Sequence, residues 1–120
     1  MQDYRNLFVW QKAHRLTLDA FADSAKHLTA RPCWELRGQI HKAAISVPSN
    51  LAEGAGRGSS SDFRRFVFYS LGSVNELEYD LLLAKDLRFL PVELPDGRAA
   101  QIQEVRRMLS SFAQTLDKAT

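Results

Sequence analysis

The stretch that decides the fold is residues 40–57, IHKAAISVPSNLAEGAGR. Apolar residues recur through it, and just before it, at steps of three or four, which places them on one face of a helix; they are Leu36, Ile40, Ala43, Val47, Leu51 and Ala55. Pro48 lies inside this pattern and removes the hydrogen bond to the carbonyl of Ala44. We therefore expect a bent helix whose packing holds both halves, a feature that indicates an architecture and no reaction.

The same helical period recurs on both sides of this stretch. We predict helices over residues 6–28, from 33 or 34 to 56, over 60–88, and through a final segment with apolar positions Ile102, Val105, Leu109, Phe112 and Leu116. Residues 89–97 hold two prolines and a glycine and are expected to form the longest connection. No segment shows the period-two alternation of a strand. The sequence predicts an all-α protein, an antiparallel four-helix bundle forming one domain over residues 1–120.

The first predicted helix is apolar on two adjoining faces, whereas a surface helix needs only one. One stripe consists of Leu7, Trp10, His14, Leu18, Phe21, Ala25 and Leu28. The other consists of Val9, Ala13, Leu16 and Ala20. We therefore expect this helix to touch two layers of protein, and His14 to be a buried, hydrogen-bonded histidine.

Composition is that of an ordinary globular domain, with 120 residues, 45% of them hydrophobic and 25% charged. The chain has no apolar run long enough for a membrane span, and its N-terminus lacks the apolar segment of a signal peptide. Cys33 is the single cysteine, which excludes an internal disulfide and agrees with a reducing compartment. We expect a cytoplasmic protein with no membrane partner.

Residues that could carry chemistry do not fall into known catalytic or metal-binding patterns. None of the three histidines follows a glutamate by three residues, as the di-iron bundles require. The serines around residue 60 are explained by helix capping, in which Ser59 and Asp62 form the capping pair, better than by a nucleophile elbow. We predict no catalytic residue, no metal and no cofactor.

Basic residues gather around the predicted start of the third helix. Arg57, Arg64 and Arg65 lie close to backbone N–H groups that favour an anion, and Lys42 adds to a local positive excess in a chain of net charge +2. We predict that these four residues bind the phosphates of RNA or DNA. A solvated charged surface is the plainer interpretation of the same cluster.

Gly72 lies in the middle of the third predicted helix, where glycine costs roughly 1 kcal/mol relative to alanine. It shares a face with Tyr69, Glu76 and Tyr79, separate from the apolar stripe. Two interpretations stay open for this Gly72 face: a close packing contact inside the bundle, or an interface between subunits.

Three motifs in order resemble the four-helix bundle proteins encoded within intervening sequences of bacterial large-subunit ribosomal RNA genes. They are Leu7–His14, Gln39–Gly54, and Phe63–Phe66 followed by Gly72–Glu78. The resemblance implies a homopentamer, similar in fold to the accessory proteins of diversity-generating retroelements, which bind nucleic acid and a reverse transcriptase. It does not imply an enzyme. The family often has consecutive basic residues where this chain has His41 and Lys42, which lowers the positive charge expected there at neutral pH.

These observations leave three hypotheses for function. The first is a non-enzymatic, homo-oligomeric helical scaffold whose basic surface binds nucleic acid or a nucleic-acid enzyme. The second is an adaptor that binds only proteins. The third and weakest is an enzyme with a site at a subunit junction, using Glu53, Glu76 or His14.

Overall fold

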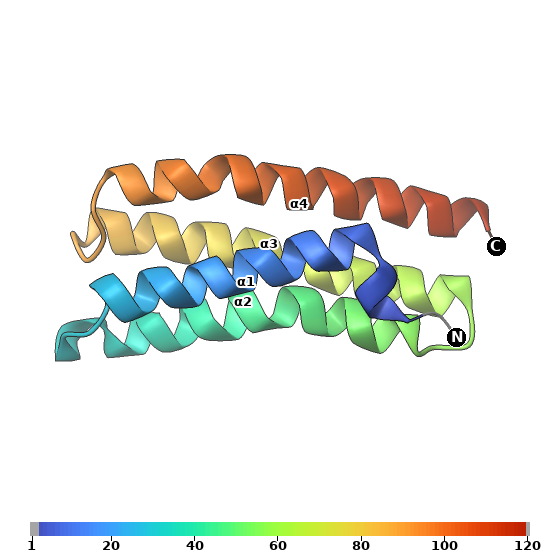
Figure 1. Cartoon of the computed structure of the whole chain (residues 1–120), viewed down its shortest axis with the longest axis horizontal. Coiled ribbons are helices and arrows are strands. Elements are labelled where there is room, and N and C mark those ends of the chain that lie inside the picture. Colours follow the sequence, from blue (N-terminus) through green and yellow to red (C-terminus); the bar gives the residue numbers. More distant parts are fainter. Residues whose placement is uncertain (1–2, 120) are drawn as a thin grey trace.

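The computed structural model describes residues 3–119, which form four long helices: α1 (Phe8–His27), α2 (Trp34–Ala55), α3 (Ser60–Asp86) and α4 (Glu93–Lys118). Single turns of 3-10 helix, η1 (Tyr4–Asn6) and η2 (Arg31–Cys33), precede α1 and α2. The four helices run side by side in alternating directions along a body of 47 × 21 × 19 Å (Figure 1). Each helix contacts the next, and α4 returns to α1. The predicted all-α, antiparallel four-helix bundle is confirmed for the described range, which leaves out residues 1, 2 and 120.

The core is built from the predicted stripes of α2, α3 and α4. Every residue of the α2 stripe is buried. The α3 residues that follow one another at steps of four and three are buried as well; they are Phe63, Val67, Ser70, Val74, Leu77, Leu81 and Ala84. In α4, Ile102, Val105 and Leu109 are almost completely buried, while Phe112 is partly so. Burying one large aliphatic side chain contributes roughly 1.5–3 kcal/mol, so these continuous stripes hold the bundle together.

The sequence predicted two apolar stripes on α1 without choosing between them, and the structure buries all of the stripe of smaller residues but only the two ends of the other, Leu7 and Leu28. Val9, Ala13, Leu16 and Ala20 are buried, whereas Leu18 and Phe21 are 47% and 37% exposed. His14 is exposed, and its ring stacks on that of Trp10 with centroids 4.8 Å apart. The prediction of a buried histidine is therefore wrong. Small alanines let α1 approach its neighbours closely, which the bulky aromatic stripe does not allow.

Polar side chains on α1 fix its rotation through contacts with α4. Asp23 is 9% exposed and accepts two hydrogen bonds from Arg98, at 2.7 and 2.9 Å. Asp19 accepts one from Gln101, and Lys12 pairs with Glu104 at 3.2 Å. Because a buried carboxylate requires a partner, the Asp23–Arg98 pair excludes the alternative rotation that would bury the aromatic stripe.

Pro48 lies inside α2 without ending it, and the carbonyl that it leaves without a donor is bound by another helix. The Thr17 hydroxyl of α1 donates to the Ala44 carbonyl at 2.7 Å, replacing the backbone N–H that Pro48 lacks. On the other side of α2, the Ser70 hydroxyl of α3 donates to the Val47 carbonyl at 2.8 Å. The carbonyl freed by Pro48 is therefore satisfied by α1, while α3 makes a separate hydrogen bond to the neighbouring turn of α2.

Glycine permits a close helix contact at Gly54 rather than at Gly72. A Cβ added at Gly54 would lie 2.7 Å from Phe63 Cδ1 and 2.8 Å from Phe66 Cβ, both on α3. A Cβ added at Gly72 would meet nothing within 4 Å. The interpretation of Gly72 as a packing contact inside the bundle is therefore wrong.

The connection between α3 and α4 is shorter than expected. Helix α3 ends at Asp86 and α4 begins at Glu93, so Pro95 and Gly97 lie in the first turns of α4, where backbone N–H groups have no acceptor inside the helix and proline is tolerated. Arg88, with φ of 64°, is the one non-glycine residue in the described range in the left-handed region. The Phe89 N–H donates back to the Ala84 carbonyl at 2.8 Å, which completes a Schellman motif.

Candidate functional site

The three arginines predicted to bind nucleic acid do lie near the start of α3, but each is paired with a carboxylate. Arg57 bonds to Glu53 at 3.0 Å and Arg65 to Asp62 at 2.8 Å, while Arg64 lies 3.8 Å from Asp117. Hydrogen bonding to Asp62 also raises the pKa of Arg65. Three positive and three negative charges therefore balance within this cluster.

The helix start itself is occupied by its own cap. The Ser59 hydroxyl accepts a hydrogen bond from the Asp62 N–H at 3.1 Å, as the sequence predicted, and the Asp62 carboxylate lies in the first turn. Lys42 lies on α2, fifteen residues before Arg57, which corresponds to about 22 Å along a helix at 1.5 Å per residue. The structure brings the three arginines together and leaves Lys42 apart from them.

Aromatic rings accompany the arginines. The guanidinium groups of Arg57 and Arg65 lie 4.8 and 5.1 Å from the centroid of the Phe66 ring, within cation–π distance. Arg64 lies 4.8 Å from the ring of Phe68, which is 46% exposed. The cluster is therefore an arginine–aromatic surface with little net charge.

The Gly72 face is open to solvent. Tyr69 and Tyr79 are 48% and 59% exposed, and space is free beside Gly72. Glu76 differs from the other three residues because it lines a cavity between α2 and α3. The face is thus available for contact, and its tyrosines are the exposed anchors.

A groove between α1 and α2 with a single charged side chain was not predicted as a site. One hollow is lined by Tyr4, Trp10, His14, Thr17, Ile45, Pro48, Ser49 and Ala52. A second hollow, toward the other end of the same two helices, is lined by Phe21, Ser24, Ala25, Trp34, Arg37, Gly38 and His41. We call these two hollows together the α1–α2 groove. Arg37 is the only lysine, arginine, aspartate or glutamate in these two sets.

His41 lies in the α1–α2 groove, where its ring is held by contacts with α1. Its Nε2 lies 2.8 Å from the Ser24 hydroxyl, and its ring stacks on Phe21 with centroids 4.1 Å apart. Burial, and secondly the charge of Arg37, lowers the pKa of His41. The α1 stripe that contains Trp10 and Phe21 was the sequence signal for this groove, because its aromatic residues needed a neighbour that the bundle does not supply.

The residues considered for catalysis lie in separate settings. Glu53 pairs with Arg57, His14 stacks on Trp10, and Glu76 faces the α2–α3 cavity. Within residues 3–119, no group of three or more histidines, cysteines, aspartates or glutamates is placed to hold a metal ion. In the same range, no helix is both long and apolar enough to cross a membrane.

The protein is a small antiparallel four-helix bundle. Its exposed surfaces include the α1–α2 groove, the Gly72 face and the arginine–aromatic surface. The chain belongs to the 23S rRNA-intervening sequence protein family, whose model matches residues 5–111. The match runs from η1 into the second half of α4, and it confirms the family that the three sequence motifs resemble. A search of curated proteins finds no match to this chain.

Proposed function

We propose that the protein is a homo-oligomeric scaffold rather than an enzyme, and that copies of the bundle join through the α1–α2 groove. The observation that supports this is the groove itself, where Trp10, Phe21 and Trp34 line hollows with a single formal charge, that of Arg37. Uncharged surfaces rich in tryptophan, tyrosine and phenylalanine are typical of the centres of protein interfaces.

A closed ring of subunits requires two different faces on every copy, because each copy contacts one neighbour on either side. The Gly72 face supplies the second: the space beside Gly72 admits another helix, and Tyr69 and Tyr79 are exposed to anchor it. The α1–α2 groove of one copy then receives the Gly72 face of the next. Five copies, the number that the family resemblance implies, have a mass of about 68 kDa, five times the 13.6 kDa of one chain.

Light scattering on variants tests this assembly. We expect Phe21→Asp and Ile45→Asp, both at exposed positions in the groove, to give a 13.6 kDa species with an unchanged circular dichroism spectrum. Gly72→Leu is expected to do the same through the other face. Phe8→Asp is the matched control, because Phe8 is 64% exposed on α1 but outside the groove. A monomeric parent chain at micromolar concentration would contradict the proposal.

A second function, contact with RNA or DNA or with a nucleic-acid enzyme such as a reverse transcriptase, is supported by the arginine–aromatic surface. The side chains of Arg57 and Arg65 are 42% and 53% exposed and lie over Phe66, and single strands are bound by such combinations of arginine and aromatic rings. A phosphate has to displace the paired carboxylates, so one copy binds weakly. Repetition around a ring multiplies weak contacts when the strand spans them.

A salt titration of RNA retention tests this second function. If three phosphate contacts per chain form, log affinity falls against log salt with a slope of about −2 for a single strand. Replacing Arg57, Arg64 and Arg65 by glutamine is expected to abolish retention at low salt. The control replaces three exposed arginines elsewhere, Arg15, Arg88 and Arg107, with the same change in charge. If the parent chain retains no RNA, the adaptor that binds only proteins becomes the better function.

A further inference from the structure

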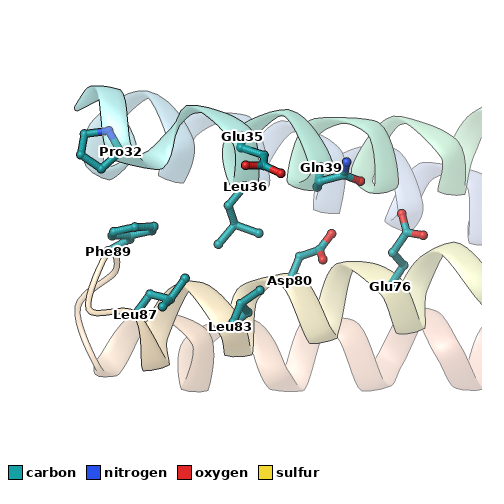
Figure 2. A pocket seen from close by; sticks show the side chains of 9 residues that line it. All are labelled: Pro32, Glu35, Leu36, Gln39, Glu76, Asp80, Leu83, Leu87 and Phe89. Atoms are coloured by element: carbon teal, nitrogen blue, oxygen red, sulfur yellow. The ribbon is translucent and has the colours of Figure 1, made fainter.

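A cavity of about 470 Å³ lies between α2 and α3, near the first turns of α2 and the last turns of α3 (Figure 2). Its walls are largely apolar and include Leu36 from α2 and Leu83 from α3, with Phe89 closing one end. Cavities of this size hold small organic ligands. The assembly and nucleic-acid surfaces proposed above make no use of this space, apart from Glu76 at its margin.

Three carboxyl groups line the cavity, and no basic residue does. Glu35 belongs to α2, while Glu76 and Asp80 belong to α3, one turn apart. Figure 2 shows the carboxyl groups of Glu76 and Asp80 directed from α3 toward α2 across the space. The cavity therefore combines apolar walls with negative charge on both of its long sides.

Asp80 is the unusual member of this set. It is 6% exposed, and its Oδ2 is buried without a hydrogen-bond partner. Burial, and secondly the charge of Glu76, raises the pKa of Asp80. An unpartnered buried carboxylate is costly, and a positively charged group beside it would offset that cost.

A metal ion does not suit this arrangement. Glu35, Glu76 and Asp80 do not converge closely enough to form a metal-binding group, and Ca²⁺ and Mg²⁺ need six or more oxygen ligands around one point. Charge spread along an apolar cavity instead matches a ligand that has both a cationic head and an apolar stem.

We propose that the α2–α3 cavity binds an organic cation, an ammonium or guanidinium group on an apolar stem, with Asp80 as its principal anion and Glu76 and Glu35 beside it. The stem lies against Leu36, Leu83 and Phe89, and the head donates hydrogen bonds to the carboxyl group of Asp80. Two sources share this chemistry: a free amine of low molecular weight, and a lysine or arginine side chain of another polypeptide.

Calorimetric titration tests the cavity with defined probes. We expect 1,5-diaminopentane and butylguanidine to bind the parent protein, and 1-pentanol and Mg²⁺ not to bind. Asp80→Asn keeps the shape of the side chain and removes its charge. We expect it to lower the affinity for the amine by about tenfold to a hundredfold, the loss typical of a charge-assisted hydrogen bond. Asp86→Asn, on the exposed side of the same helix, is the matched control and is expected to bind as the parent does.

Probes of the two sources separate them. Tighter binding of N-acetyl-arginine methylamide than of 1,5-diaminopentane assigns the site to a side chain of another polypeptide, and the reverse order assigns it to a free amine. Either result supports the proposal if Asp80→Asn weakens that binding by about tenfold or more. Equal binding by the parent and Asp80→Asn, or binding of 1-pentanol as tight as that of the amine, overturns it. Failure of every probe to bind the parent overturns it as well, whatever the oligomeric state.

Discussion

The two sides of α2 differ in how closely the neighbouring helix approaches. Toward α3, Gly54 has no side chain, and the rings of Phe63 and Phe66 fill that space. Toward α1, the contact is made by small residues and the Thr17 hydroxyl, while Phe21 stays at the surface. Residue size along the contact line, rather than total hydrophobicity, thus decides which apolar face is buried and which remains available to a partner.

The largest expected effect comes from adding a side chain at Gly54, on the side of α2 where α3 approaches most closely. Gly54→Ala places a Cβ within 2.8 Å of two phenylalanines, and the nearest atom of Phe66 is its own Cβ, which cannot move without the helix. We expect a loss of about 2 kcal/mol in the free energy of unfolding, although alanine is the better helix former by about 1 kcal/mol. Urea denaturation measures this loss.

Gly72→Ala is the matched control for this prediction. It makes the same change in the middle of α3, whereas Gly54 lies in the last turn of α2, and it meets open space, so it is expected to stabilise the chain by up to about 1 kcal/mol. If both glycines respond alike, close approach at Gly54 does not distinguish the two sides of α2.

A smaller effect is expected from removing the Thr17 hydroxyl, on the side of α2 that faces α1. Thr17→Val keeps the shape of the side chain but leaves the Ala44 carbonyl without the donor that replaces the one missing at Pro48. We expect a loss of about 1.5 kcal/mol. In a Pro48→Ala background the backbone N–H returns, and the same Thr17 substitution is expected to cost much less. Equal losses in both backgrounds would show that the hydroxyl acts independently of the proline.

The smallest expected change in stability comes from Asp80, in the cavity between α2 and α3. Because folding raises the pKa of Asp80, its contribution to stability is greatest at low pH, where the carboxyl is protonated, and is lost as the pH rises through the raised pKa. Without a ligand, Asp80→Asn is expected to stabilise the protein by about 1 kcal/mol at pH 7 and to change little below about pH 4. Stability curves at the two pH values, with Asp86→Asn as control, decide this. A variant less stable than the parent at pH 7 would contradict it.

Helices α2 and α3 could be predicted because each has one continuous apolar stripe at steps of three or four residues. Periodicity then has one solution, and every stripe residue from Leu36 to Ala55 and from Phe63 to Ala84 is buried. Helix α1 has two adjoining apolar stripes, so periodicity alone could not choose between them. Besides residue size, the pairing of Asp23 with Arg98 favours the observed rotation, and the local sequence pattern does not show a partner 75 residues away.

The candidate sites divide in the same way. The arginines at the start of α3 cluster because they are near in sequence, and two of their carboxylate partners, Glu53 and Asp62, could be expected from spacings of four and three residues. The burial of Asp80 could not be expected from the sequence, because Leu36 and Phe89, which line the same cavity, belong to separate segments of the chain. In sequence Asp80 reads as one more charged residue on a helix.

The hydrogen bond from Thr17 to the Ala44 carbonyl has a consequence for the order of folding. A helix that contains Pro48 cannot complete its backbone hydrogen bonding by itself, so α2 in isolation leaves one carbonyl to water. Docking of α1 supplies the missing donor and buries the small residues that surround it. The N-terminal pair of helices is therefore expected to form as a single cooperative unit, in which neither helix reaches its full stability before the other arrives.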